Sequence, residues 1–141
     1  MNGTLSIELL AAHPELLPVL QEWFEAEWPS YYRASSLGDA QRDLQAFTNH
    51  GSLPVGVVAF REGSVCGVAA LTAESIASHR HLSPWAGAGL VRPSERGKGI
   101  GAQLLAALEQ EARTLGFPPH LLRYESIIHE GQGLGIYCKA L

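Results

Sequence analysis

In residues 96–101 every second residue is a glycine, and two of the other three residues, Arg96 and Lys98, are basic. The apolar residues 85–91 precede this stretch, and the amphipathic residues 101–116 follow it. A strand that runs into such a turn, with a helix starting at once, leaves unpaired backbone N–H groups at the helix N-terminus, where the helix dipole favours an anion. Glycine has no Cβ, so backbone and ligand can approach closely. The pattern therefore predicts a site for a phosphate or a diphosphate.

Two other phosphate-binding motifs fit these residues less well. A P-loop requires Ser or Thr after its lysine, whereas Lys98 is followed by Gly99. A dinucleotide-binding fingerprint that starts at Gly97 would have Ala102 in its third glycine position, which is allowed, but it belongs after the first strand of a fold. Such a fingerprint also needs an acid ~20 residues further on, and Glu125 lies farther away. A glycine-rich surface turn without a ligand is the remaining interpretation.

A third pattern, R/Q-x-x-G-x-G/A, fits residues 96–101, and Val91 and Pro93 stand before it in the order V-x-P. In these features residues 83–117 resemble the central strand, coenzyme A loop and helix of the GNAT superfamily of N-acetyltransferases. A similar order of elements extends over residues 4–125. The resemblance implies an α/β (α+β) fold, in which a mixed, mostly antiparallel central sheet is flanked by helices. The length of 141 residues fits a single such domain over residues 1–141.

The resemblance further implies how acetyl-CoA, the expected cosubstrate, is bound. The end of the central strand, at Leu90 and Val91, would pair with the pantetheine arm as an added strand does. The pyrophosphate would lie against the loop residues Arg96, Gly97, Lys98, Gly99, Ile100, Gly101 and Ala102. Coenzyme A carries both an anionic diphosphate and an amide-bearing arm, so its chemistry agrees with the anion site expected from the glycines.

Direct acetyl transfer needs an acid that protonates the leaving thiolate. Many GNAT enzymes use a tyrosine near the start of the last helix, in a motif similar to Y-x-K-L-G-F. Tyr137, in the sequence "GIYCKAL", matches that placement, which implies that Tyr137 is the general acid. A phenol with a pKa of about 10 can protonate a thiolate of similar basicity. A packed tyrosine without a catalytic role is the alternative.

The general base is less sharply marked. Residues 83–91 contain no acid, so the glutamate that some relatives carry on this strand has no counterpart. Glu74 could orient a water molecule, and His79, His81 and Glu125 are alternatives that ordinary loop or edge positions would also explain. Two histidines at i and i+2, without cysteine or a carboxylate cluster, make a weak metal site, and no metal is expected.

Aromatic residues early in the chain are expected either in the core or along an acceptor pocket; they are Trp23, Phe24, Trp28, Tyr31 and Tyr32.

Periodicity and turn residues predict the elements that position these groups. The expected order is β-α-α-β-β-β-α-β followed by an unassigned tail. Asp39 is expected to cap the second helix, and the glycine-centred turn at residues 61–64 predicts a hairpin. Small residues in the strand before the glycine loop predict a bulge or a close backbone approach. The strands are expected at 4–10, within 53–75 on both sides of the turn, at 83–91 and at 120–126, and the helices at 13–28, 39–47 and 101–116.

The C-terminal tail departs from the GNAT pattern. Relatives continue beyond the tyrosine with two strands that close the sheet, whereas this sequence ends at Leu141. The sheet is therefore expected to lack these C-terminal strands and to leave its last strand open. Unpaired strand edges attract other chains, so a homodimer that covers this edge is expected.

Composition narrows the class of protein. The chain has 141 residues, of which 46% are hydrophobic and 17% charged, and these values are typical of a globular domain. The net charge of −4 and the lack of a basic cluster argue against nucleic acid as a partner. No apolar run approaches the ~18 residues of a membrane span, and the N-terminus lacks signal-peptide features. Two distant cysteines fit a reducing cytosol, so a cytoplasmic location is expected.

The sequence thus predicts an acetyl-CoA-dependent N-acetyltransferase that acts on a primary amine of a small molecule or peptide. A GNAT-like module that binds coenzyme A without turnover is the alternative, because the closing strands are missing. A nucleotide-binding regulator would rest only on the weak glycine fingerprint.

Overall fold

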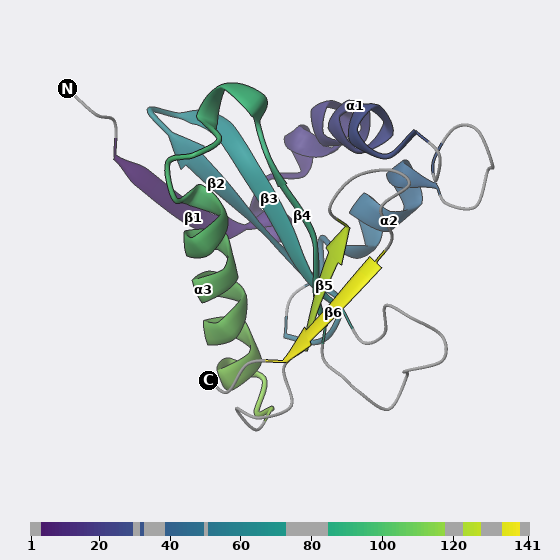
Figure 1. Cartoon of the computed structure of the whole chain (residues 1–141), viewed down its shortest axis with the longest axis vertical. Coiled ribbons are helices and arrows are strands. Elements are labelled where there is room, and N and C mark those ends of the chain that lie inside the picture. Colours follow the sequence, from purple (N-terminus) through teal and green to yellow (C-terminus); the bar gives the residue numbers. More distant parts are fainter. Residues whose placement is uncertain are drawn as a thin grey trace.

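In the computed structural model, the described residues are 4–29, 32, 39–49, 51–72, 85–117, 123–127 and 134–138. Strands and helices follow one another along the chain in the order that the periodicity predicts, and one further strand is added at the end (Figure 1). The strands are β1 (Leu5–Leu9), β2 (Val55–Arg61), β3 (Ser64–Thr72), β4 (Trp85–Val91), β5 (Arg123–Ile127) and β6 (Leu134–Cys138). The α-helices are α1 (Leu17–Glu27), α2 (Ala40–Ala46) and α3 (Ile100–Thr114). Short 3₁₀ turns are η1 (Leu10–Ala12), η2 (Pro14–Leu16) and η5 (Pro93–Glu95).

The strands form a six-stranded sheet in the order β1-β2-β3-β4-β5-β6. Every neighbouring pair is antiparallel except β4 and β5, which are parallel because α3 connects them on one side of the sheet. The prediction of a mixed, mostly antiparallel sheet flanked by helices is therefore confirmed.

The C-terminal edge differs from the expectation. The tail, which periodicity left unassigned, contributes β6, and β6 pairs with β5 along all of its five residues. The edge of β5 that was expected to be open is therefore covered by the chain itself. This finding removes the reason for which a second subunit was expected there.

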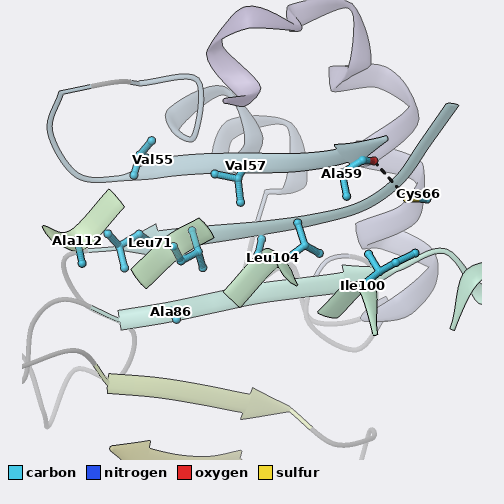
Figure 2. Close-up of a cluster of buried hydrophobic side chains, with 11 residues drawn as sticks. Val55, Val57, Ala59, Cys66, Leu71, Ala86, Ile100, Leu104 and Ala112 are labelled. Atoms are coloured by element: carbon cyan, nitrogen blue, oxygen red, sulfur yellow. Dashed lines mark hydrogen bonds between the residues drawn. The ribbon is translucent and has the colours of Figure 1, made fainter. Parts of the chain in front are cut away.

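Helix α3 covers one face of the sheet, and α1 and α2 cover the other (Figure 1). Ile100, Leu104 and Leu108 of α3 are buried in one cluster with side chains of β2 and β3. Figure 2 shows Ile100 and Leu104 in this cluster beside Val57 and Leu71. A Cβ on Gly67 of β3 would lie 2.9 Å from Leu104 Cδ1 and 3.2 Å from Ile100 Cγ2. A side chain at Gly67 would therefore displace Leu104 or Ile100 where the start of α3 meets the sheet.

Local signals of the sequence explain where several elements begin and end. The Asp39 carboxylate accepts the N–H of Arg42 at 3.1 Å and so caps α2, as predicted. The hairpin turn between β2 and β3 has Glu62 and Gly63 at positive φ, the geometry of a tight two-residue turn. Gly116, with a φ of 89°, ends α3.

Candidate functional site

The connection from β4 to α3 contains the glycine-rich turn. Gly97 and Gly99 have φ values of 79° and 82°, which L side chains rarely adopt. Gly99 is the N-cap of α3, and no side chain in the described part of the chain caps that helix. A Cβ on Gly97, Gly99 or Gly101 would meet nothing within 4 Å. The space beside these three glycines is therefore open, and no described side chain caps the N-terminus of α3. Both features are what an anion site at a helix N-terminus requires.

The cationic side chains of this turn are held by acidic partners. Lys98 Nζ lies 3.3 Å from Glu95 Oε2, and Arg61 Nε lies 2.9 Å from Glu95 Oε1. Burial acts to raise the pKa of Glu95, but Lys98 and then Arg61 outweigh it and hold that pKa below its ordinary value. The ionised Glu95 therefore ties the turn to the end of β2.

Arg96 connects the turn to a different part of the fold. Its Nε donates to the Val91 carbonyl at 2.8 Å, and its Nη2 lies 2.8 Å from Oε1 of Glu27, the last residue of α1. Sequence reasoning missed Glu27, because its partner is 69 residues away and no local pattern marks the pair.

Strand β4 is bulged close to its end. Its register against β3 shifts between the pairs Val68–Leu90 and Ala70–Gly87, so the predicted bulge is confirmed. In the described residues, β4 and β5 pair only at Trp85–Arg123 and Ala86–Tyr124. Beyond these pairs the two parallel strands part, and among the described strands the last residues of β4 pair only with β3.

The two β4 residues expected at the pantetheine arm differ in the direction of their backbone groups. Arg92 donates its N–H to the Cys66 carbonyl of β3 at 2.8 Å. Polar groups of successive residues alternate between the two sides of a strand, so Leu90 also faces β3, whereas Val91 faces the β5 side. The Leu90 side chain is buried on the α1 and α2 face. Val91 therefore offers backbone groups to a ligand in the gap.

An aromatic cluster lies where α1 ends. The rings of Phe24, Trp28 and Tyr32 have centroids 5.2–6.5 Å apart. The Tyr32 hydroxyl donates to Asp43 Oδ2 at 2.9 Å. Burial raises the pKa of Asp43, although the bond from Tyr32 opposes the shift. Sequence reasoning named the aromatic residues but not Asp43, whose contact links α2 to Tyr32, a residue beyond the end of α1.

The predicted site residues fall into two groups. Those of the turn and the end of β4 follow one another along the chain; Leu90 and Ile100 are buried among them, and the other residues are partly or fully exposed. Tyr137 lies in β6 opposite Tyr124, and not at the start of a helix as the motif implied, because the tail pairs with β5. Glu125 lies in β5 opposite Ile136. Glu74, His79 and His81 lie outside the described residues.

Two findings concern other classes of site. Where the structure describes the chain, no three His, Cys, Asp or Glu side chains are grouped as metal ligands would be. Among the described helices, none has the length and apolar character needed to cross a bilayer.

Comparisons with known proteins agree with this arrangement. A sequence model of the Acetyltransferase (GNAT) family matches residues 17–125, while no curated protein sequence matches the chain. A GNAT family acetyltransferase from Brucella melitensis, solved with acetyl-CoA, is 20% identical with a TM-score of 0.64 over 99% of this chain and 89% of that one. A GNAT family acetyltransferase from Streptococcus pneumoniae is 16% identical with a TM-score of 0.62, over 98% of this chain and 100% of that one.

An aminoglycoside 6'-N-acetyltransferase complexed with coenzyme A is 18% identical with a TM-score of 0.66 over 86% of this chain. The match spans 61% of that enzyme's length. At these identities the structural likeness shows the fold, whereas the family model covers most of the sequence, including α1, the glycine-rich turn and the first residues of β5. The chain belongs to the GNAT family of acetyltransferases.

Proposed function

We propose that this protein is an acetyl-CoA-dependent N-acetyltransferase that transfers the acetyl group directly to a primary amine of a small molecule or peptide. The observation that carries the proposal is the uncapped N-terminus of α3, which follows two left-handed glycines at the end of a strand that parts from its neighbour. The unpaired part of β4 is thus followed directly by the expected anion site. In coenzyme A the amide-bearing arm is likewise joined directly to the diphosphate.

The diphosphate would be bound by the backbone N–H groups of residues 97–102, where the helix dipole adds to the attraction. Lys98 would add a positive charge, since its side chain is half exposed although its ammonium lies 3.3 Å from Glu95 Oε2. The arm would lie along the free side of β4, with the backbone of Val91 as its hydrogen-bonding partner. Such pairing would place the thioester near the point where β4 and β5 part.

In direct transfer, the neutral amine nitrogen attacks the thioester carbon and loses a proton, the C–S bond breaks, and the thiolate takes up a proton. Tyr137 is proposed as the donor of that proton. In support, its backbone lies two strands from Ala86, the last residue that joins β4 to β5, because Tyr137 pairs with Tyr124 and Tyr124 with Ala86. Glu74 is proposed to orient a water that accepts the proton of the amine.

Charge and sheet topology bear on the acceptor and on the oligomeric state. The net charge of −4 suits a cationic amine better than an anionic acceptor. We retain a cytoplasmic location, a single domain over residues 1–141 and a homodimer as proposals. The outer strands of the sheet are β1 and β6, so a dimer through a sheet edge would use one of these.

A coenzyme A-binding module without turnover is the competing proposal. The reason for considering such a module was a sheet left open beside β5, and the pairing of β6 with β5 weakens that reason. The test is the release of free thiol from acetyl-CoA in the presence of a polyamine, an amino sugar or a peptide with a free N-terminus. Thiol release that depends on one of these amines, and an acetylated product of matching mass, would support the transferase. Calorimetric binding of acetyl-CoA without amine-dependent release would favour the module.

A further inference from the structure

The ion pair between Arg96 and Glu27 joins the glycine-rich turn to the end of α1. Both Arg96 contacts are short, at 2.8 Å to Glu27 Oε1 and 2.8 Å to the Val91 carbonyl oxygen. The guanidinium is therefore held beside the end of β4 from two sides. Glu27 and Arg96 are 36% and 48% exposed, so water and ligands can reach the pair.

The position of Glu27 is not explained by the helix to which it belongs. A carboxylate at a helix C-terminus faces the negative end of the helix dipole, which disfavours it. The last turn of α1 contains no basic residue that would offset this cost. Arg96, which is 69 residues away in the sequence, provides the compensating positive charge.

The carbonyl to which Arg96 donates is the one that a bound arm would use. Val91 faces the gap beside β4, because Arg92 on its C-terminal side faces β3. The Arg96 side chain thus occupies the hydrogen-bonding position of an added strand. An anionic diphosphate at the N-terminus of α3 would attract the same side chain away from Glu27.

We propose that Glu27 is a positioning residue that holds Arg96 on the Val91 carbonyl in the ligand-free protein, and that coenzyme A must break this contact in order to bind. The inference rests on the proposed coenzyme A site. It means that Glu27 lowers the affinity for coenzyme A, and that ligand binding releases a carboxylate at the end of α1, next to the aromatic cluster.

The test is calorimetry with coenzyme A on Glu27→Ala and on the matched variant Glu22→Ala. Glu22 is an exposed glutamate of the same helix, so its replacement removes the same charge without touching Arg96. An exposed ion pair of ordinary strength predicts that Glu27→Ala binds coenzyme A about two- to fivefold more tightly than the wild type. Glu22→Ala should bind as the wild type does.

The Arg96→Gln background separates the contact from simple charge removal. Backbone groups hold the diphosphate, so Arg96→Gln should bind coenzyme A measurably, and adding Glu27→Ala should bring little further gain. Three results would overturn the proposal: Glu27→Ala binding no tighter than the wild type, an equal gain in Glu22→Ala, or an undiminished gain in the Arg96→Gln background. Loss of binding in Arg96→Gln alone would also contradict it, since the side chain would then be the chief ligand. A wild-type chain that fails to bind coenzyme A would instead refute the proposed function itself.

Discussion

Ala86 of β4 pairs with Tyr124 of β5, and this is the last pair that joins the described parts of the two parallel strands. Tyr124 also pairs with Tyr137 of β6, so three backbones lie in a row across the sheet where β4 and β5 begin to part. The row joins the first part of β4 to the residue proposed as the general acid, whereas the proposed anion site follows the other end of β4, after Val91.

Replacing Tyr137 by Phe should lower turnover with a working amine and leave the affinity for coenzyme A nearly unchanged. Loss of a general acid typically costs about 10²–10⁴-fold in rate, whereas the backbone groups that bind the cosubstrate are not altered. Steady-state kinetics together with calorimetry separate the two effects. Tyr124→Phe is the matched control and should keep its turnover. If Tyr137→Phe turns over at the wild-type rate, the tyrosine has no acid role.

The sequence predicted those features that depend on neighbouring residues. The turn at Gly63, the cap at Asp39 and the start of α3 after Gly99 each follow from local backbone preferences, so they could be placed without the fold. The bulge in β4 followed from its small residues in the same way.

Pairings between distant segments could not be predicted. The motif around Tyr137 indicated a helix start, yet Ile136 and Tyr137 favour strands, and pairing with β5 prevails over the local motif. The contact of Arg96 with Glu27 likewise depends on how α1 packs on the sheet, which no spacing in the sequence shows.

Gly67→Ala should destabilise the fold, because the new Cβ would lie 2.9 Å from Leu104 Cδ1 and 3.2 Å from Ile100 Cγ2. Overpacking of this kind costs about 1–3 kcal/mol in the free energy of unfolding. Denaturant unfolding measures the change. Leu104→Ala alone should cost about 2–5 kcal/mol by leaving a cavity in a buried cluster.

The double variant provides the control. Leu104→Ala removes the nearer of the two atoms that the new Cβ would meet, so Gly67→Ala should cost less in that background than in the wild type. Additive losses in unfolding free energy would show that α3 is not held at this distance by Gly67.

The stability of the fold should depend on pH through His13. A hydrogen bond with Glu8 at 2.8 Å raises the pKa of His13; burial opposes this, and Glu15 at 3.2 Å adds to the rise. Since the folded pKa exceeds the ordinary value of about 6.5, this stabilisation is complete below that value and is lost as pH rises through the folded pKa. The free energy of unfolding should therefore fall from pH 6 toward pH 8.5.

His13→Gln isolates this contribution from the other titrating groups. The variant should lose stability relative to the wild type at pH 6 and differ little from it at pH 8.5. Glu8→Gln should flatten the same pH dependence, since it removes the partner with the largest effect. If the unfolding free energies of the wild type and His13→Gln differ by the same amount at every pH in this range, the ion pairs of His13 do not cause the pH dependence.

The central claim, that acetyl-CoA binds at the N-terminus of α3, is tested most directly by calorimetry on Gly99→Val. Gly99 and Gly51 share nearly the same backbone geometry, with φ values of 82° and 79° and no atom within 4 Å of an added Cβ. They lie near opposite ends of the sheet, since Gly51 precedes β2 and Gly99 follows β4. We predict that Gly99→Val loses at least tenfold in affinity for acetyl-CoA, about 1.4 kcal/mol, while Gly51→Val binds as the wild type does. Unchanged affinity in a folded Gly99→Val protein would contradict the account.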